Sequence, residues 1–141
     1  MLFRSVIINP KKKLIEKEKT LLCATALTYF FIDILIKKTK SNFKLSDFLI
    51  YVLLATICDV MPLRKINKVI ANNIIDDFDI KNNKALSFIF NQFNIKKKIT
   101  IEDLGFLIGP IINAGGRLNH SKYGVELLSS DDYEIIKDKS L

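Results

Sequence analysis

The fold is decided by residues 48–63, FLIYVLLATICDVMPL. Residues 48–57 carry no charge, and Thr56 is the only clearly polar side chain among them. Ser46 can start a helix here, because its hydroxyl can accept a hydrogen bond from a free backbone N–H. Pro62 cannot continue the helix, since it lacks an N–H and its ring clashes with the preceding turn. The stretch therefore predicts a buried helix of about twelve residues that ends by presenting Asp59.

The carboxylate of Asp59 needs a partner at the end of so apolar a segment. Burying a charge is costly unless a cation or hydrogen-bond donors accompany it. A metal ion is one such partner. The other is the set of backbone N–H groups in the turn before Pro62. The residue types alone leave both possibilities open.

The totals describe one small basic domain. The chain has 141 residues, 49% of them hydrophobic, which suits about one folded domain and excludes a disordered chain. Its net charge of +7 suits a polyanionic partner. Nearly all the basic residues are lysines, so the three arginines, Arg4, Arg64 and Arg117, are more informative. The planar guanidinium group matches phosphate or carboxylate in a way that lysine cannot copy.

The cysteines and the apolar segments point to the cytoplasm. Cys23 and Cys58 lie in apolar runs, and the absence of a CxxC motif or a Cys/His cluster argues against zinc. Such thiols are typical of free cysteines in a reducing cytosol. The first residues, MLFRSVIINPKKK, do not form a secretory signal. The best membrane candidate, Leu21–Ile36, is interrupted by polar residues and falls short of the ~20 residues needed to cross a bilayer.

Periodicity predicts a mainly helical chain with about six helices. One begins in the charged residues 11–19 and continues through Leu21–Ile36, where it should be buried on most sides and should pack against Phe48–Ile57. A short strand is predicted at Val6–Ile8, and the polar tail Ser129–Leu141 is assigned no element. The other predicted helices are Ile66–Phe78, with Ile66, Val69, Ile70, Ile74 and Phe78 on one stripe; Lys84–Phe93, with Leu86, Ile89, Phe90 and Phe93 inward; 100–113; and about Tyr123–Leu128.

The helix from Thr100 carries its own start and stop signals. Thr100 and Asp103 resemble a capping box, and Pro110 should kink the helix. Gly115-Gly116 should end it near Asn113. The acidic residues Asp76, Asp77 and Asp79, by contrast, lack a calcium-loop pattern and are interpreted as a solvated turn.

The second informative stretch is Gly105–Asn119, GFLIGPIINAGGRLN. Glycine amides can approach an anion closely, Asn113 adds a side-chain amide, and Arg117 adds a bidentate donor. This pattern is consistent with a phosphate-binding turn. It is equally consistent with a plain glycine cap in which Arg117 pairs with an acidic neighbour. His120, the only histidine, could be a base or a ligand, but a single histidine in a polar loop is usually neither.

Taken together, these stretches strongly resemble the RecJ family of the DHH phosphoesterase superfamily. The resemblance rests on ATICDVMPL at 55–63, LGFLIGPIINAGGRL at 104–118 and GVELLSSDD at 124–132. Residues 6–11, VIINPK, and 21–31, LLCATALTYFF, look like the segment just after the family's DHH motif. The match covers nearly the whole chain in the right order.

The resemblance implies a function and a set of site residues. The family degrades single-stranded DNA from the 5′ end by two-metal hydrolysis with Mn²⁺ or Mg²⁺, in DNA repair and recombination. Asp59 matches a metal-binding aspartate of the family. A phosphate-contacting turn of the family is matched by Asn113, Gly115, Gly116 and Arg117. Ile111 departs from the pattern, because many relatives carry an arginine there.

The resemblance also implies a division of the chain and a fold class. Residues 1–98 correspond to the C-terminal part of the DHH catalytic domain, 99–119 to the connecting helix and phosphate-binding turn, and 120–141 to the start of the second domain. The intact family fold is α/β, of which this chain, mainly α by itself, looks like an internal piece. The family's other metal ligands lie upstream of VIINPK.

Two hypotheses about function follow. The first is a RecJ-like exonuclease fragment that is inactive alone. Its partners would be single-stranded DNA and the missing N-terminal and C-terminal parts of the enzyme, with no membrane involved. The alternative is a non-catalytic helical DNA-binding or scaffold piece, or the product of a decayed gene.

Overall fold

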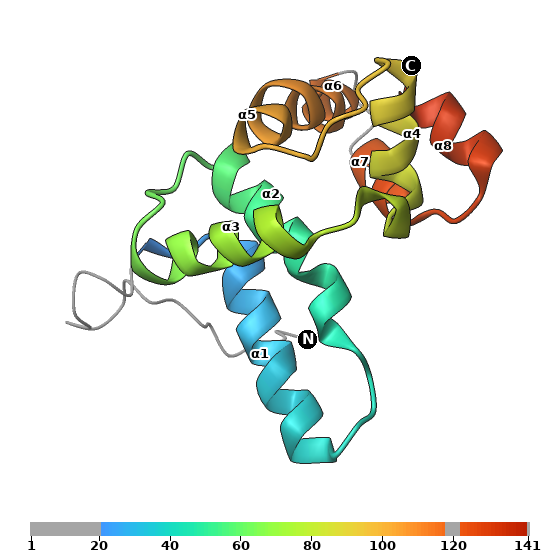
Figure 1. The fold of residues 1–141 in the computed structure, drawn as a ribbon. Coiled ribbons are helices and arrows are strands. Elements are labelled where there is room, and N and C mark those ends of the chain that lie inside the picture. Colours follow the sequence, from blue (N-terminus) through green and yellow to red (C-terminus); the bar gives the residue numbers. More distant parts are fainter. Residues whose placement is uncertain (1–20, 118–121, 141) are drawn as a thin grey trace.

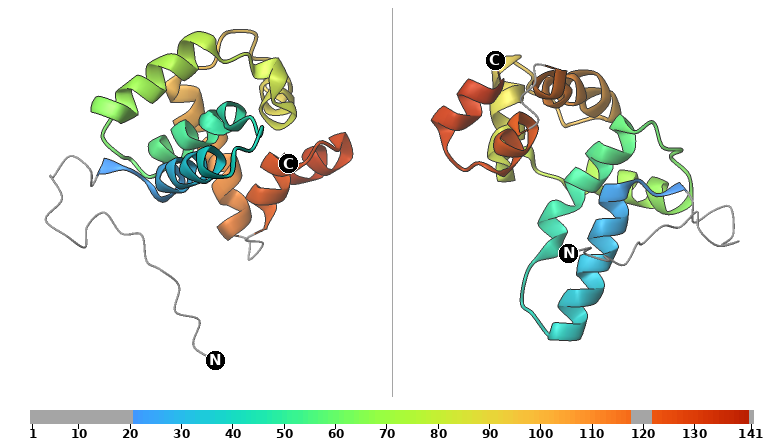
Figure 2. Two further views of the ribbon diagram at one scale, coloured as in Figure 1. Left: turned by 90° about the horizontal axis from the view of Figure 1, so that it is seen from below. Right: turned by 180° about the vertical axis from the view of Figure 1, so that it is seen from behind.

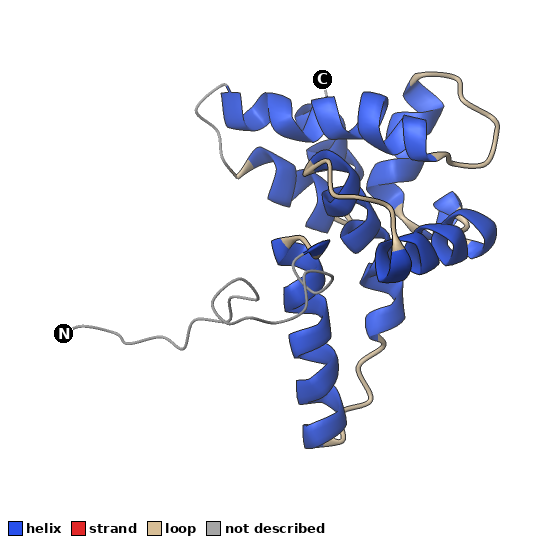
Figure 3. Cartoon of the chain, turned by 90° about the vertical axis from the view of Figure 1, so that its left-hand side faces the viewer, coloured by secondary structure: helices blue, strands red, loops and turns tan. Residues whose placement is uncertain are grey.

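The structure is a computed structural model that describes residues 21–117 and 122–140. Every regular element within these ranges is a helix, which confirms the mainly α prediction (Figures 1 and 3). The predicted strand at 6–8, the helix start at 11–19 and His120 lie outside the described residues.

A helical hairpin forms one side of the molecule. Helix α1 (Ala24–Thr39) and helix α2 (Leu49–Cys58) pack against each other, as predicted, and α1 projects from the other helices together with the start of α2 (Figures 1 and 2). The sulfur of Cys23 lies 3.5 Å from the hydroxyl oxygen of Thr56 inside the pair. Helix α2 carries much of the core, through its buried residues Ile50, Val52, Leu53, Leu54 and Thr56.

The entrance to α2 differs from the prediction. A short 3₁₀ helix, Leu45–Phe48, leads into it, and no side chain caps its first turn. The hydroxyl of Ser46 donates to the carboxylate of Asp47 instead. The predicted Ser46 cap is therefore wrong, because the chain reaches the helix through a tighter turn that uses the backbone carbonyl of Ser46.

The prediction that the first apolar helix is buried on most sides is also wrong. Within α1 only Ala26 is buried, whereas Phe31, Ile34 and Leu35 are 45%, 60% and 41% exposed. The reason is that α2 covers one side of a helix that stands away from the rest of the molecule. None of the described helices is long and apolar enough to cross a membrane.

Two further helices complete the first half of the core. Helix α3 (Lys65–Asp77) packs on α2, and helix α4 (Lys84–Gln92) packs on the last two helices. Both lie where the sequence predicts them. Their inward residues are fewer than predicted, because Ile66, Val69 and Phe93 are exposed. The buried set from these helices is Asn67, Ile70, Ala71, Ile74, Ala85, Leu86, Ile89 and Phe90.

The next helical stretch starts as predicted but continues differently. Thr100 and Asp103 form a complete capping box at the start of α5 (Ile101–Asp103). A wide π turn, Leu104–Ile108, follows and leads into α6 (Gly109–Arg117). In that turn the N–H of Gly109 bonds to the carbonyl of Leu104, five residues back. Proline cannot donate in a helix, so the irregularity expected at Pro110 is accommodated by the wide turn immediately before it.

The predicted end of this helix near Asn113 is wrong. Helix α6 runs on to Arg117, so the two glycines at 115 and 116 lie within its last turns. Glycine costs a helix only about 1 kcal/mol per residue, and packing of α6 against the following helix stabilises this part of it. The predicted phosphate-binding turn is thus the C-terminal end of α6.

The C-terminal segment adds a helix that the sequence analysis missed. Helix α7 (Tyr123–Ser129) is present as predicted, and α8 (Tyr133–Ser140) follows in the polar tail, for which the sequence predicts no element. Ile136 is buried, and the rings of Tyr133 and Phe88 meet edge to face with their centroids 5.1 Å apart. The ammonium of Lys139 lies 4.0 Å from the centroid of the Tyr123 ring, which links α8 to α7.

Candidate functional site

Asp59 lies exposed at the C-terminal end of α2. Its backbone N–H donates to the carbonyl of Ala55 at 2.9 Å, which continues the helical pattern by one residue. Within the described residues no hydrogen bond reaches its carboxylate. Backbone donors in the turn before Pro62 therefore do not satisfy this group, and solvent can hydrate it in the isolated chain.

The turn after Asp59 is a Schellman motif. The N–H of Val60 donates to the carbonyl of Ile57 at 3.0 Å, and the N–H of Met61 donates to that of Thr56 at 2.9 Å. Val60 adopts the left-handed conformation that this motif requires, with φ of 53°. The motif turns the chain sharply away from α2 directly after the carboxylate.

Two glycines allow the helical stretch through α6 to approach the end of α2. A Cβ atom on Gly105 would lie 3.1 Å from Cγ2 of Ile57, and one on Gly109 would lie 2.9 Å from the sulfur of Cys58. Any side chain at Gly109 would therefore hold the two helices apart. Asn113 follows Gly109 by four residues and so shares its side of α6. The glycines thus set how closely the second motif approaches Asp59.

Asp59 and Asn113 line the same groove, whose volume is about 690 Å³. Arg117 follows Asn113 by one further helical turn along the backbone of α6, but its side chain lies outside the described part of the structure. The structure therefore brings together the two motifs that the sequence analysis singled out. The groove also has apolar walls, from Phe48, Leu54, Ala55, Ile112, Val125 and Leu128.

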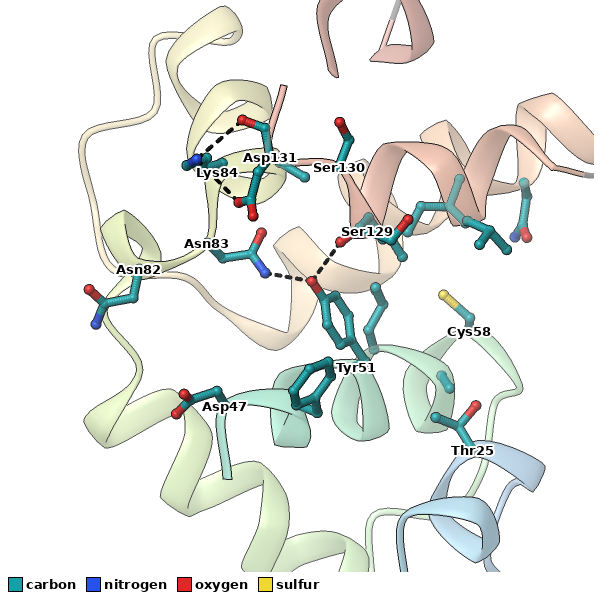
Figure 4. A pocket seen from close by; sticks show the side chains of 18 of the residues that line it. Thr25, Asp47, Tyr51, Cys58, Asn82, Asn83, Lys84, Ser129, Ser130 and Asp131 are labelled. Atoms are coloured by element: carbon teal, nitrogen blue, oxygen red, sulfur yellow. Dashed lines mark hydrogen bonds and ion pairs between the residues drawn. The ribbon is translucent and has the colours of Figure 1, made fainter. Parts of the chain in front are cut away.

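The far end of this groove holds a hydrogen-bonded cluster that sequence reasoning missed. The hydroxyl of Tyr51 donates to the carbonyl of Leu128 at 2.9 Å and accepts from the side-chain amide of Asn83 at 2.8 Å (Figure 4). Nearby, the ammonium of Lys84 lies 3.2 Å from the carboxylate of Asp131. Tyr51 could have predicted this cluster, because its hydroxyl lies in an otherwise apolar run and a buried tyrosine hydroxyl needs a hydrogen-bond partner.

The described residues do not form a two-metal site by themselves. They include no group of three or more histidine, cysteine, aspartate or glutamate side chains that could hold an ion. Mn²⁺ and Mg²⁺ need several oxygen ligands, and Asp59 supplies one carboxylate. Burial, followed by the charge of Asp59, raises the pKa of the Cys58 thiol. This neighbour therefore stays protonated at neutral pH and is a poor ligand.

Comparison with known proteins supports the resemblance found in the motifs. No family profile matches the chain, and no solved structure matches it. The single-stranded-DNA-specific exonuclease RecJ of Haemophilus influenzae is 33% identical over 125 residues, which are 86% of this chain and 21% of that protein. The RecJ proteins of Dickeya dadantii and Escherichia coli are 33% and 35% identical over 92 residues, which are 62% of this chain and 16% of each protein.

The extent of these matches agrees with the prediction of a RecJ piece. The chain spans at most about a fifth of the length of the curated relatives it matches. The chain is therefore related to RecJ, and the resemblance deduced from its motifs is confirmed.

Proposed function

We propose that this chain is part of a RecJ-type exonuclease that hydrolyses single-stranded DNA from the 5′ end in cytoplasmic DNA repair and recombination. The observation that carries the proposal is the shared groove, which both Asp59 and Asn113 line although they are far apart in the sequence. The names of the relatives, all single-stranded-DNA-specific exonucleases, support the choice of substrate.

Each site residue has a distinct role in this proposal. Asp59 contributes one oxygen ligand to a Mn²⁺ or Mg²⁺ site whose other ligands come from outside the described residues. Asn113 and Arg117 donate hydrogen bonds to DNA phosphate. Gly115 and Gly116 lie in the last turns of α6 and carry no side chains, so they leave space for the DNA strand next to Arg117.

The groove also supports the proposed division of the chain. Its lining includes Asp59 from the part at 1–98, Asn113 from the part at 99–119, and Leu128 from the part at 120–141. Within this groove Asp59 supplies a single carboxylate, whereas Mn²⁺ and Mg²⁺ need several oxygen ligands. We therefore propose that the chain alone binds single-stranded DNA weakly and does not cleave it.

The test compares the chain alone with a reconstituted enzyme. Purified residues 1–141 are incubated with 5′-labelled single-stranded DNA and Mn²⁺, and no cleavage is expected. The DNA flanking the reading frame is then searched for a frame encoding a DHH motif, and its product is co-expressed with this chain. Cleavage is expected from the combined proteins, and Asp59→Asn should abolish it.

The controls separate the proposed roles. Asp76→Asn changes an exposed aspartate remote from the groove lining and should leave cleavage intact. Arg117→Ala should weaken DNA binding and lower its salt slope by about one, compared with Arg64→Ala at an exposed arginine. Cleavage by the chain alone that disappears in Asp59→Ala would contradict the incomplete-site proposal. Equal cleavage by wild type and Asp59→Asn in the reconstituted enzyme would remove the role given to Asp59.

A further inference from the structure

The turn at residues 59–62 contains a backbone conformation that its sequence disfavours. Val60 has a φ of 53°, and a β-branched residue in the left-handed region costs about 1–2 kcal/mol. Its side chain is 87% exposed, so packing offsets little of that cost. Backbone strain of this kind persists only where the surrounding structure holds it in place, and it concentrates at functional sites.

The group that holds the turn is Asn67, a residue of α3 that is 1% exposed. Its side-chain amide donates to the carbonyl of Pro62 at 3.0 Å and to that of Leu21 at 2.9 Å. The opposite orientation of the amide would set its oxygen against two carbonyls, so the contacts fix the orientation. The turn is thereby bonded at both ends, to α2 through Val60 and Met61 and to α3 through Pro62.

Asn67 has an energetic cost of its own. Its side-chain oxygen is buried and has no hydrogen-bond partner within the described structure. Leaving a buried acceptor unpaired costs about 1–3 kcal/mol. A turn selected for stability alone would carry glycine at 60. The strained backbone of Val60 and the unpaired oxygen of Asn67 both belong to the structure of the 59–62 turn, which begins with Asp59.

We propose that Asn67 is a positioning residue for Asp59. It orients Asp59 by holding the turn at residues 59–62 in its strained conformation. Without the bond from Asn67, the carbonyl of Pro62 keeps only the local bond from the N–H of Arg64 at 2.9 Å, and the turn loses its side-chain anchor to α3. Val60 can then leave the left-handed region, and the two Schellman bonds break. The direction of the Asp59 carboxylate relative to Asn113 changes as a result. The inference deepens the proposed function of Asp59, but the clamp is a property of this chain and needs neither DNA nor metal.

Amide hydrogen exchange on residues 1–141 tests the clamp. In Asn67→Ala the amides of Val60 and Met61 should exchange about tenfold faster or more. The amides of Asn94 and Ile95, which form the same turn after α4, should change much less. Asn72→Ala, at an exposed asparagine of the same helix, should leave all four amides unchanged. Asn67→Asp, which keeps the shape but loses the donors, provides a second variant if the alanine form folds poorly.

Adding Val60→Gly distinguishes positioning from simple packing. Glycine adopts the left-handed conformation without support, so the Val60→Gly, Asn67→Ala double variant should regain the protection of Met61 and of the amide at 60. The backbone NMR signals of Asp59 should shift in Asn67→Ala and return in the double variant. If Asn67→Ala accelerates all amides equally, or if Val60→Gly leaves its effect unchanged, Asn67 is a packing residue and the proposal fails. The exonuclease proposal would stand in that case, because neither DNA nor metal enters the experiment.

Discussion

The ends of α2 and α4 share one hydrogen-bonding pattern and reach it by different means. After α4 the N–H groups of Asn94 and Ile95 donate to the carbonyls of Asn91 and Phe90, and φ of Asn94 is 54°. Asparagine tolerates this conformation, and the neighbouring Phe93 is exposed. After α2 the same turn contains Val60 and is held by tertiary contacts. The local sequence specifies one turn, and the surrounding structure imposes the other beside a candidate site residue.

A side chain at Gly109, which would separate α6 from the end of α2, should have the largest effect on the free energy of unfolding. Gly109→Val places a Cβ 2.9 Å from the sulfur of Cys58 and 3.2 Å from the carbonyl oxygen of Leu104, with two methyl groups beyond it. Overpacking of this kind should lower the free energy of unfolding by about 3 kcal/mol, measured by urea denaturation. Ala114→Val, at an exposed site of the same helix, controls for helix propensity. Equal losses in the two variants would show that α6 does not need this close approach.

Substitutions at Val60 and Asn94, the left-handed residues after α2 and α4, should change the free energy of unfolding in opposite directions. Val60→Gly relieves strain and should raise the free energy of unfolding by about 1 kcal/mol, after allowing for the greater freedom of glycine in the unfolded chain. Asn94→Val introduces the same strain after α4 and should lower it by about 1–2 kcal/mol. Thermal unfolding measures both. A loss of stability in Val60→Gly would mean that the valine side chain makes a stabilising contact that its exposure conceals.

Low pH should weaken the capping box of Thr100 and Asp103 at the start of α5. Burial alone would raise the pKa of Asp103, but hydrogen bonds from Thr100 and Lys97 outweigh it and lower the pKa. Because the folded-state pKa is lowered, this stabilisation is present above the unfolded value of about 3.9 and is lost as the pH falls through the folded value. Urea denaturation at pH 7 and pH 3 should therefore show a loss of about 1 kcal/mol from this box, which Asp103→Asn should reduce. An equal pH dependence in that variant would assign the effect to other carboxylates.

The smallest effect is expected at the turn that its own sequence favours. Asn94→Gly should change the free energy of unfolding by only a few tenths of a kcal/mol, because asparagine and glycine both accept the left-handed region. Its Tm should remain within about one degree of the wild type. A shift as large as that of Val60→Gly would show that asparagine is strained here too, and the contrast between the two helix ends would disappear.

The sequence could predict those elements whose signals are local. The apolar run of α2, its end at Asp59, and the capping box of Thr100 and Asp103 all depend on neighbouring residues, and all are confirmed. The extent of α6 could not be predicted in this way. Its continuation past Asn113 depends on contact with α7, which local glycine preferences do not report. Helix α8 was missed because its apolar residues are few and its fit against α4 is tertiary.

The candidate site divides in the same way. Asp59 and Asn113 were selected from residue type and from the resemblance, and the fold places both of them in the lining of one groove. Nothing local marks Val60 as strained or Asn67 as its clamp, since valine is common in apolar segments and asparagine is common on helix surfaces. Only the hydrogen bonds of Asn67, which span from residue 21 to residue 67, reveal that function.

The exposed side of α1 has a calorimetric consequence. The heat capacity of a protein rises on unfolding because apolar surface becomes hydrated. Phe31, Ile34 and Leu35 are already partly hydrated in the folded chain, so they add less to that increase than buried side chains would. The heat-capacity change of residues 1–141 should therefore fall below the roughly 12–15 cal/mol/K per residue typical of globular proteins. Its stability curve should be correspondingly flatter, so that cooling below the temperature of maximum stability costs this chain less than it costs a domain with a closed core.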